Sequence, residues 1–168
     1  GLTSDFAWNL LGLGGLVMPF DRSAQKIPSN GYDNWTGYPD ARARLVRMIQ
    51  KRGKNVVIAG GDSHMFFIGN LPSRRGDLES PPVAPEFHGT SVSSISTNGL
   101  PIGPDPRAAT NPHISMIHDQ RGYLLFDVKP EIWHTDLRVV DQVFTPGGRI
   151  GTLARYVVEP GRPQAVRA

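Results

Sequence analysis

The sequence predicts an α/β fold in which a mixed sheet is joined to an antiparallel meander at the C-terminal end. Three observations lead to this prediction: an amphipathic helix over residues 39–52, a strand apolar on both faces over residues 55–59, and three later strands separated by turn residues. A helix followed after a short turn by a fully apolar strand is typical of a sheet buried between two layers. We therefore expect a layered domain.

The helix is predicted from its ends and from its periodicity. Pro39 suits the first helical position, Asp40 suits the positive end of the helix dipole, and Gly53 suits the residue after the helix. Apolar residues recur at helical spacing, which predicts a buried face. The residues of this face are Ala41, Leu45, Met48 and Ile49. The basic residues opposite either are solvated or attract anionic substrates or nucleic acid.

The N-terminal region is predicted to contain one short helix before a long loop. Ser4 is a suitable N-cap for a helix over residues 5–11, which the following glycines would end. Residues 16–18 are apolar and are predicted to form a short strand or an extended segment. Residues 20–37 are rich in Gly, Pro, Asn and Ser, and this composition predicts a loop.

The second half of the chain is predicted to be a long loop followed by the meander. Residues 69–122 are predicted to be mostly loop, with a short strand over residues 83–87. The meander strands are predicted over residues 123–128, 136–144 and 155–159. In the middle strand, one face is predicted to carry Leu137 and Val139 and the other Arg138 and Val140.

Composition limits the classes of protein to which the chain can belong. Its 168 residues are enough for one domain with its own core. The net charge is +3, and no aromatic-plus-basic pattern supports nucleic-acid binding, so nucleic acid is expected at most as a substrate. The absence of cysteine excludes disulfides and thiolate ligands within the chain. No apolar run is long enough to span a membrane. The sequence starts without a targeting signature, so we expect any such signal upstream.

The segment Gly61-Asp62-Ser63-His64 directly follows the predicted apolar strand. In open α/β sheets, ligands collect beyond the carboxyl ends of the strands, and glycines let the backbone approach a ligand closely. Asp62 offers a hard oxygen ligand and His64 an imidazole, a combination that suits hydrolytic metal ions. If the segment is extended, the two side chains point to the same side. The alternative is that Asp62 only caps a following helix.

Two further clusters are candidates for ligand binding. Residues 89–91 could present backbone N–H and hydroxyl groups to an anion, or they could form an ordinary turn. His88, just before them, could equally be a surface histidine. Asn111 and His113 flank a proline and could supply or orient a ligand, although a loop histidine is more often structural or solvated.

Six short motifs occur in order along nearly the whole chain. They are Asp33-Asn34-Trp35-Thr36-Gly37-Tyr38-Pro39, Val56-Val57-Ile58-Ala59-Gly60-Gly61-Asp62-Ser63-His64, Glu86-Phe87-His88-Gly89-Thr90-Ser91-Val92, Asn111-Pro112-His113, Arg121-Gly122-Tyr123 and Arg138-Val139-Val140-Asp141. Each motif is weak by itself, but the ordered set resembles the C-terminal half of the PhoD-like alkaline phosphatase/phosphodiesterase family, within the calcineurin-type metallophosphoesterases.

The resemblance implies a four-layer α/β/β/α sandwich and the hydrolysis of phosphate mono- or diesters. It implies Asp62 and His64 as metal ligands, with His64 also the catalytic candidate, and Asn111 and His113 as residues that support the substrate pocket. The implied cofactors are metal ions in a di- or multinuclear site, iron and/or calcium. An extracytoplasmic location, periplasmic or secreted, is implied in the same way.

The resemblance also implies that this chain holds one side of the site. The family's other metal ligands come from upstream motifs, and none is visible before Asp33. Residues 1–168 are therefore expected to be the C-terminal part of one catalytic domain, completed by its N-terminal part or by another chain. Exposed apolar surface would favour self-association. The alternatives are a non-catalytic binding or structural module and a nucleic-acid binder that uses the basic helix.

Overall fold

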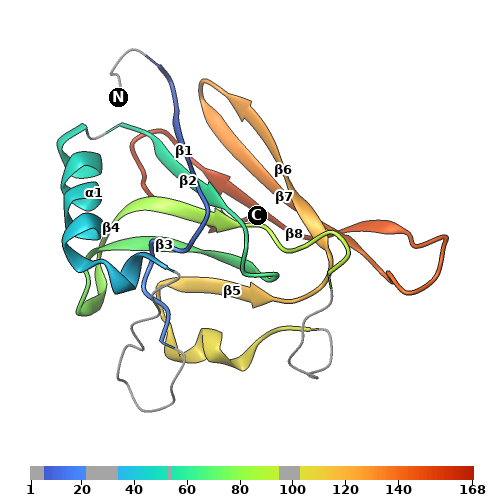
Figure 1. Ribbon diagram of the computed structural model, residues 1–168. Coiled ribbons are helices and arrows are strands. Elements are labelled where there is room, and N and C mark those ends of the chain that lie inside the picture. Colours follow the sequence, from blue (N-terminus) through green and yellow to red (C-terminus); the bar gives the residue numbers. More distant parts are fainter. Residues whose placement is uncertain (1–5, 22–33, 53, 95–102) are drawn as a thin grey trace.

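The structure consists of three packed layers, which are one α-helix and two β-sheets in the part of the chain that it describes (Figure 1). It is a computed structural model that describes residues 6–21, 34–52, 54–94 and 103–168. The helix covers one face of the first sheet, and the second sheet covers the other face. The predicted layered α/β fold is confirmed. Ser4, Asp33 and Gly53, which enter the predictions above, lie outside the described residues.

The first sheet is mixed, as predicted. Its strands in spatial order are β1 (Asn9–Leu13), β2 (Val56–Gly60), β4 (Asp77–His88), β3 (Phe66–Arg74) and β5 (Ile114–His118). β1, β2 and β4 are parallel, whereas β3 runs antiparallel to β4 and β5. The helix is α1 (Pro39–Arg52), and two 3-10 helices are η1 (Trp35–Gly37) and η2 (Pro106–Thr110).

The second sheet is the predicted antiparallel meander. Its strands in order are β6 (Gly122–Lys129), β7 (Ile132–Val140), β8 (Ile150–Val158) and β9 (Val166–Arg167). Side chains of β7 alternate between buried and partly buried, and Leu137 and Val139 lie on the buried face as predicted. The middle strand begins earlier than predicted, at Ile132, because its pairing with β6 extends to Lys129.

The predicted helix over residues 5–11 is wrong where the structure describes it. Residues 9–13 instead form β1, which pairs with β2 in parallel from Asn9 opposite Val56 to Leu13 opposite Gly60. Leu11 and Leu13 pack against the buried core between the sheet and α1. Pairing with a strand more than forty residues away outweighs a local helix signal because propensity is only a weak preference.

The short strand predicted over residues 83–87 is confirmed as part of β4, but the loop predicted around it is wrong where the structure describes it, because β3, the first half of β4 and β5 also occupy this region. Residues 95–102 lie outside the described part. The prolines of β3 and β4 argue against strands in a prediction from sequence, because proline has no N–H to donate to a neighbouring strand. β4 pairs with β2 only from Glu86 to His88. Pro81 and Pro82 therefore lie in a part of β4 that has a partner strand on one side only, where proline is tolerated.

The helix occurs at the predicted residues, but its buried face is rotated. The buried positions are Arg42, Val46 and Ile49, while Met48 is 55% exposed. Arg42 can be buried because its guanidinium donates to backbone carbonyls, with Nε 2.8 Å from Val17 O and an Nη 3.3 Å from Pro72 O. The buried face therefore includes a polar residue, which a prediction from apolar periodicity alone leaves out.

Two hydrophobic cores lie on either side of the first sheet, and alternate residues of its strands contribute to each. Val56 and Ile58 of β2 face the helix, whereas Val57 faces the second sheet. The core beneath the second sheet is rich in aromatic rings, with Trp133 and Tyr156 contributed by the meander. No helix among the described residues is long and apolar enough to cross a membrane.

Candidate active site

The 61–64 loop connects β2 to β3 at the carboxyl edge of the parallel strands. β2 ends at Gly60, which lies opposite His88, the last residue of β4. This is the edge at which open α/β sheets bind ligands, and Asp62 and His64 are both exposed there. The predicted position of these two residues, just beyond a buried strand, is confirmed.

The conformation of the loop differs from the prediction. Asp62 has φ 69° and His64 has φ 53°, so the segment is not extended. The prediction that both side chains point to the same side required an extended segment and therefore does not hold for this loop. The alternative of a helix cap is wrong as well, because Phe66 begins a strand. Residues other than glycine occupy this left-handed region at a cost of about 1–2 kcal/mol, although Asp and His tolerate it better than most.

The end of β4 holds this loop by its backbone carbonyls. The hydrogen bonds are Gly89 N to Gly60 O (2.9 Å), His88 Nδ1 to Gly61 O (3.2 Å) and Thr90 Oγ1 to His64 O (3.0 Å). The N–H of Gly89 and the hydroxyl of Thr90 are therefore already engaged. The sequence suggested that these groups could bind an anion, but the structure uses them to shape the loop.

His88 is completely buried, with 0% exposure, so its interpretation as a surface histidine is wrong. Its Nε2 lies 2.9 Å from Glu86 Oε1, and its Nδ1 faces the Gly61 carbonyl. Both partners are acceptors, so the protonated ring, with hydrogen on both nitrogens, is the form that satisfies both contacts. Burial lowers the pKa of His88, but the hydrogen bond and charge of Glu86, with smaller contributions from Gly61 and Asp62, raise it above its usual value.

Glu86 is the centre of this buried network. Its two carboxylate oxygens accept hydrogen bonds from Val17 N (2.8 Å) and Met18 N (2.7 Å). Burial lowers the pKa of the Arg42 guanidinium, and the negative charge of Glu86 opposes that shift. A buried carboxylate that contacts the His88 ring and two backbone N–H groups and interacts with the Arg42 charge has the partners that offset its desolvation.

Gly60 lets this network sit close to the strand. A Cβ at this position would lie against the His88 ring and 2.5 Å from Leu13 O. We expect Gly60→Ala to lower the free energy of unfolding by about 1–3 kcal/mol, because the added methyl group has no space. Urea unfolding followed by tryptophan fluorescence measures this loss. Gly12→Ala on the neighbouring strand is the control, because a Cβ there meets nothing within 4 Å; equal losses for both variants would contradict the prediction.

The structure does not bring Asn111 and His113 together with the 61–64 loop. They precede β5, whose start at Ile114 pairs with Gly69, whereas its end at His118 pairs with Phe66 beside the loop. Both side chains bind the backbone of the segment after residue 18. Asn111 donates to Asp21 O (3.1 Å) and accepts from Asp21 N (2.9 Å), and His113 Nε2 donates to Pro19 O (2.6 Å). Burial lowers the pKa of His113, and the Pro19 hydrogen bond opposes this shift.

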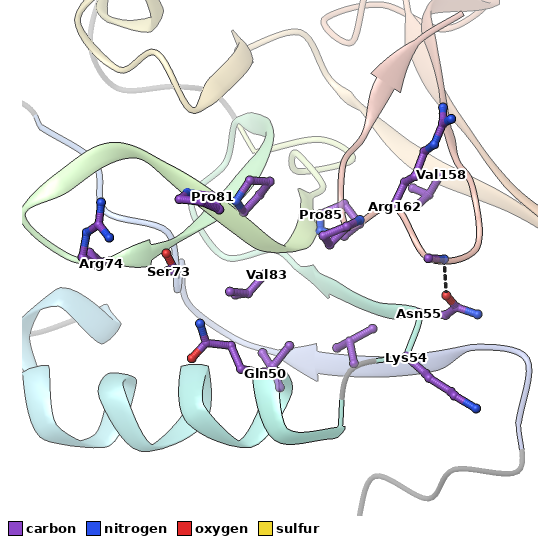
Figure 2. Close-up of a pocket in the computed structure, with 15 residues that line it drawn as sticks. Gln50, Lys54, Asn55, Ser73, Arg74, Pro81, Val83, Pro85, Val158 and Arg162 are labelled. Atoms are coloured by element: carbon purple, nitrogen blue, oxygen red, sulfur yellow. Dashed lines mark hydrogen bonds between the residues drawn. The ribbon is translucent and has the colours of Figure 1, made fainter.

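A cavity of about 400 Å³ lies at the other end of β2 from the loop (Figure 2). Val56, the first residue of β2, lines it together with Asn55, whose side-chain oxygen accepts a hydrogen bond from Gly161 N (2.8 Å). Two of its cations are paired with acids outside the lining. These pairs are Arg74 with Asp77 and Arg162 with Glu159. None of the predicted site residues lines this cavity.

The described residues can supply part of a metal site. Asp62 and His64 are exposed and of the right ligand types. Within the described ranges, however, no group of three His, Cys, Asp or Glu side chains is placed to hold an ion. Hydrolytic metal sites need several ligands for each ion, so these two residues could supply some of the ligands of such a site but not all of them.

Glu86, His88 and Arg42 were not among the site residues predicted from the sequence. Glu86 and His88 belong to one of the six motifs, but two polar residues that flank Phe87 at the end of an apolar segment are also the pattern of a half-exposed strand. Burial on both faces comes from the second sheet and from residues 16–18, so it becomes visible only in the folded chain.

Three comparisons with known proteins give matches to the same family. The profile of the family described as PhoD-like phosphatase matches residues 2–137. Alkaline phosphatase D of Bacillus subtilis (strain 168) is 33% identical over 159 residues, which are 90% of this chain and 26% of that protein. The solved structure of PhoD superposes with a TM-score of 0.81 at 29% identity and covers 96% of this chain and 31% of that one.

The chain therefore spans about a quarter of the length of the curated relative that it matches. The profile match covers five of the six motifs singled out in the sequence, from residue 33 to Tyr123, and includes the 61–64 loop. With the profile match, the sequence identity and the shared structure in agreement, the chain belongs to the PhoD-like phosphatase family.

Proposed function

We propose that this chain contributes one side of an active site that hydrolyses phosphate mono- or diesters with the help of metal ions. The observation that carries the proposal is the 61–64 loop, which exposes Asp62 and His64 at the carboxyl edge of the sheet in a member of a phosphatase family. The whole reaction needs further ligands, which we assign to residues outside the described part of the chain.

The two residues have distinct roles in this proposal. The Asp62 carboxylate holds a metal ion, and the His64 imidazole either binds metal or contacts the phosphate. A bound metal ion supplies charge that polarises the phosphoryl oxygens and lowers the pKa of a water molecule. Iron and/or calcium are the ions that the family resemblance favours. Asn111 and His113 support the region by holding the segment near Asp21, at a distance from the chemistry.

We also propose that another part of the same domain, or another chain, packs against these sheets to complete a four-layer sandwich. In support, β1 and β6 are edge strands that carry exposed apolar side chains, with Leu10 53% and Leu125 50% exposed. Such side chains on an unpaired sheet edge favour association. An extracytoplasmic location belongs to this proposal as well and rests on the family resemblance.

The proposal is tested by metal removal from the natural gene product that contains this chain. Hydrolysis of p-nitrophenyl phosphate and bis-p-nitrophenyl phosphate is measured at alkaline pH before and after treatment with a chelator. We expect chelation to lower the rate at least about 100-fold, because the charge that stabilises the reacting phosphate is lost. Re-addition of iron and calcium, singly and together, should restore the rate. Unchanged hydrolysis after verified metal removal would contradict metal dependence.

A non-catalytic module is the second candidate. The observation that favours it is that the described residues place no three-ligand group around one ion. Under this alternative, the natural gene product shows no hydrolysis of either substrate at any metal content. A metal-restored rate on either substrate excludes this alternative.

A further inference from the structure

We propose that His88 is a positioning residue, which holds the 61–64 loop in its active shape through a hydrogen bond from Nδ1 to Gly61 O. The anchor for this contact is Glu86, bound to the other ring nitrogen. The inference deepens the proposed function and rests on it for its effect on catalysis. The structural part, that His88 shapes the loop, stands on geometry alone.

The loop requires support from outside itself. Asp62 and His64 both have positive φ, and both side chains point into solvent. A backbone shape that is unfavourable for non-glycine residues persists only when neighbouring groups hold it. The Gly61 carbonyl lies directly between β2 and Asp62, so a donor bound to it sets the direction in which the chain leaves the sheet.

His88 is suited to this task because its ring is buried and has a partner at each nitrogen. Its ring is completely buried, and Glu86, which fixes it, is held in turn by Val17 N and Met18 N. The ring also lies against Gly60, where a side chain would leave no room for it. The constraint therefore runs from the core beneath α1 to the loop without passing through an exposed side chain.

A histidine at this position can donate hydrogen bonds from both ring nitrogens. The two groups on either side of the ring, a carbonyl and a carboxylate, are both acceptors. A protonated imidazole is rigid and donates in two directions from one ring. Asparagine places its amide nitrogen near the Nδ1 position and glutamine near the Nε2 position. These two substitutions therefore separate the loop contact from the Glu86 contact.

The experiment compares His88→Asn and His88→Gln in the natural gene product. The asparagine variant keeps a donor to Gly61 O, so we expect kcat to stay within about threefold of the wild type. The glutamine variant keeps the donor to Glu86 and loses the loop contact, so we expect kcat to fall roughly 10- to 100-fold with KM changed less than about twofold. Ile49→Val, in the core beneath α1, is the control for a general loss of stability. Equal kcat values for the two His88 variants would overturn the proposal.

A second measurement tests whether His88 shapes the loop and does not depend on an activity assay. Amide hydrogen exchange is followed in the 168-residue chain at Ser63, whose N–H bonds to Gly61 O at 2.8 Å. We expect faster exchange in His88→Gln than in His88→Asn or Ile49→Val. If Ser63 exchanges equally in all three variants, His88 does not shape the loop, whatever the enzyme does. If exchange differs as expected while the wild type shows no hydrolysis, the proposed function fails and the positioning role stands.

Discussion

Replacing Asp62 with asparagine is expected to lower kcat for phosphoester hydrolysis by at least about 100-fold, since even residues that only orient metal ligands cost 10- to 100-fold. Asparagine tolerates the positive φ of this position as well as aspartate does and has nearly the same shape. The substitution therefore removes the negative charge and leaves the loop conformation in place. Steady-state kinetics with both p-nitrophenyl substrates, together with metal analysis of the purified variant, measure the effect.

Ser63→Ala is the matched control for this variant. Ser63 is exposed in the same loop, and its backbone N–H still bonds to Gly61 O when the hydroxyl is removed. We expect its kcat to stay within about twofold of the wild type. An Asp62→Asn enzyme that retains full activity and full metal content would show that Asp62 is not a metal ligand, and the proposed function would lose the residue on which it rests most.

Replacing Glu86 with glutamine is expected to lower the free energy of unfolding by about 3–5 kcal/mol, the usual cost of removing one partner of a buried charge pair. The amide has one acceptor oxygen, whereas Glu86 accepts from His88, Val17 and Met18. At least one buried donor then loses its partner, and the amide N–H₂ faces other donors. Urea unfolding of the chain, followed by tryptophan fluorescence, to which the buried Trp133 contributes, measures the loss.

The control for this variant is Glu79→Gln, an exposed substitution on the same strand. It is expected to change stability by less than about 0.5 kcal/mol. A loss of under about 1 kcal/mol for Glu86→Gln would mean that the buried pair contributes little. The pH dependence is a second readout, because the folded pKa of His88 is raised. Stabilisation by the pair is complete below the unfolded pKa of about 6.5 and declines as pH rises through the folded pKa.

The sequence alone predicted the elements whose signals are local. The helix begins at Pro39 and ends at Arg52 because its terminal residues and its periodicity are properties of adjacent positions. The apolar run of β2 and the alternation of β7 are local in the same sense. The position of Asp62 and His64 beyond β2 follows directly, since it depends only on where an unmistakable strand ends. The family, too, was recognisable from short motifs in order.

Only the tertiary structure decided the features that depend on distant partners. Residues 9–13 form a strand because β2 lies beside them, and β4 extends back to Asp77, beyond the predicted residues 83–87, because Pro81 and Pro82 fall where it has a single neighbour among the described strands. His88 is a buried rather than a surface residue because Glu86, which the N–H groups of Val17 and Met18 hold, binds its ring inside the fold. Hydrogen-bond partners and burial arise from contacts between segments far apart in the chain, and no local pattern of residue types records them.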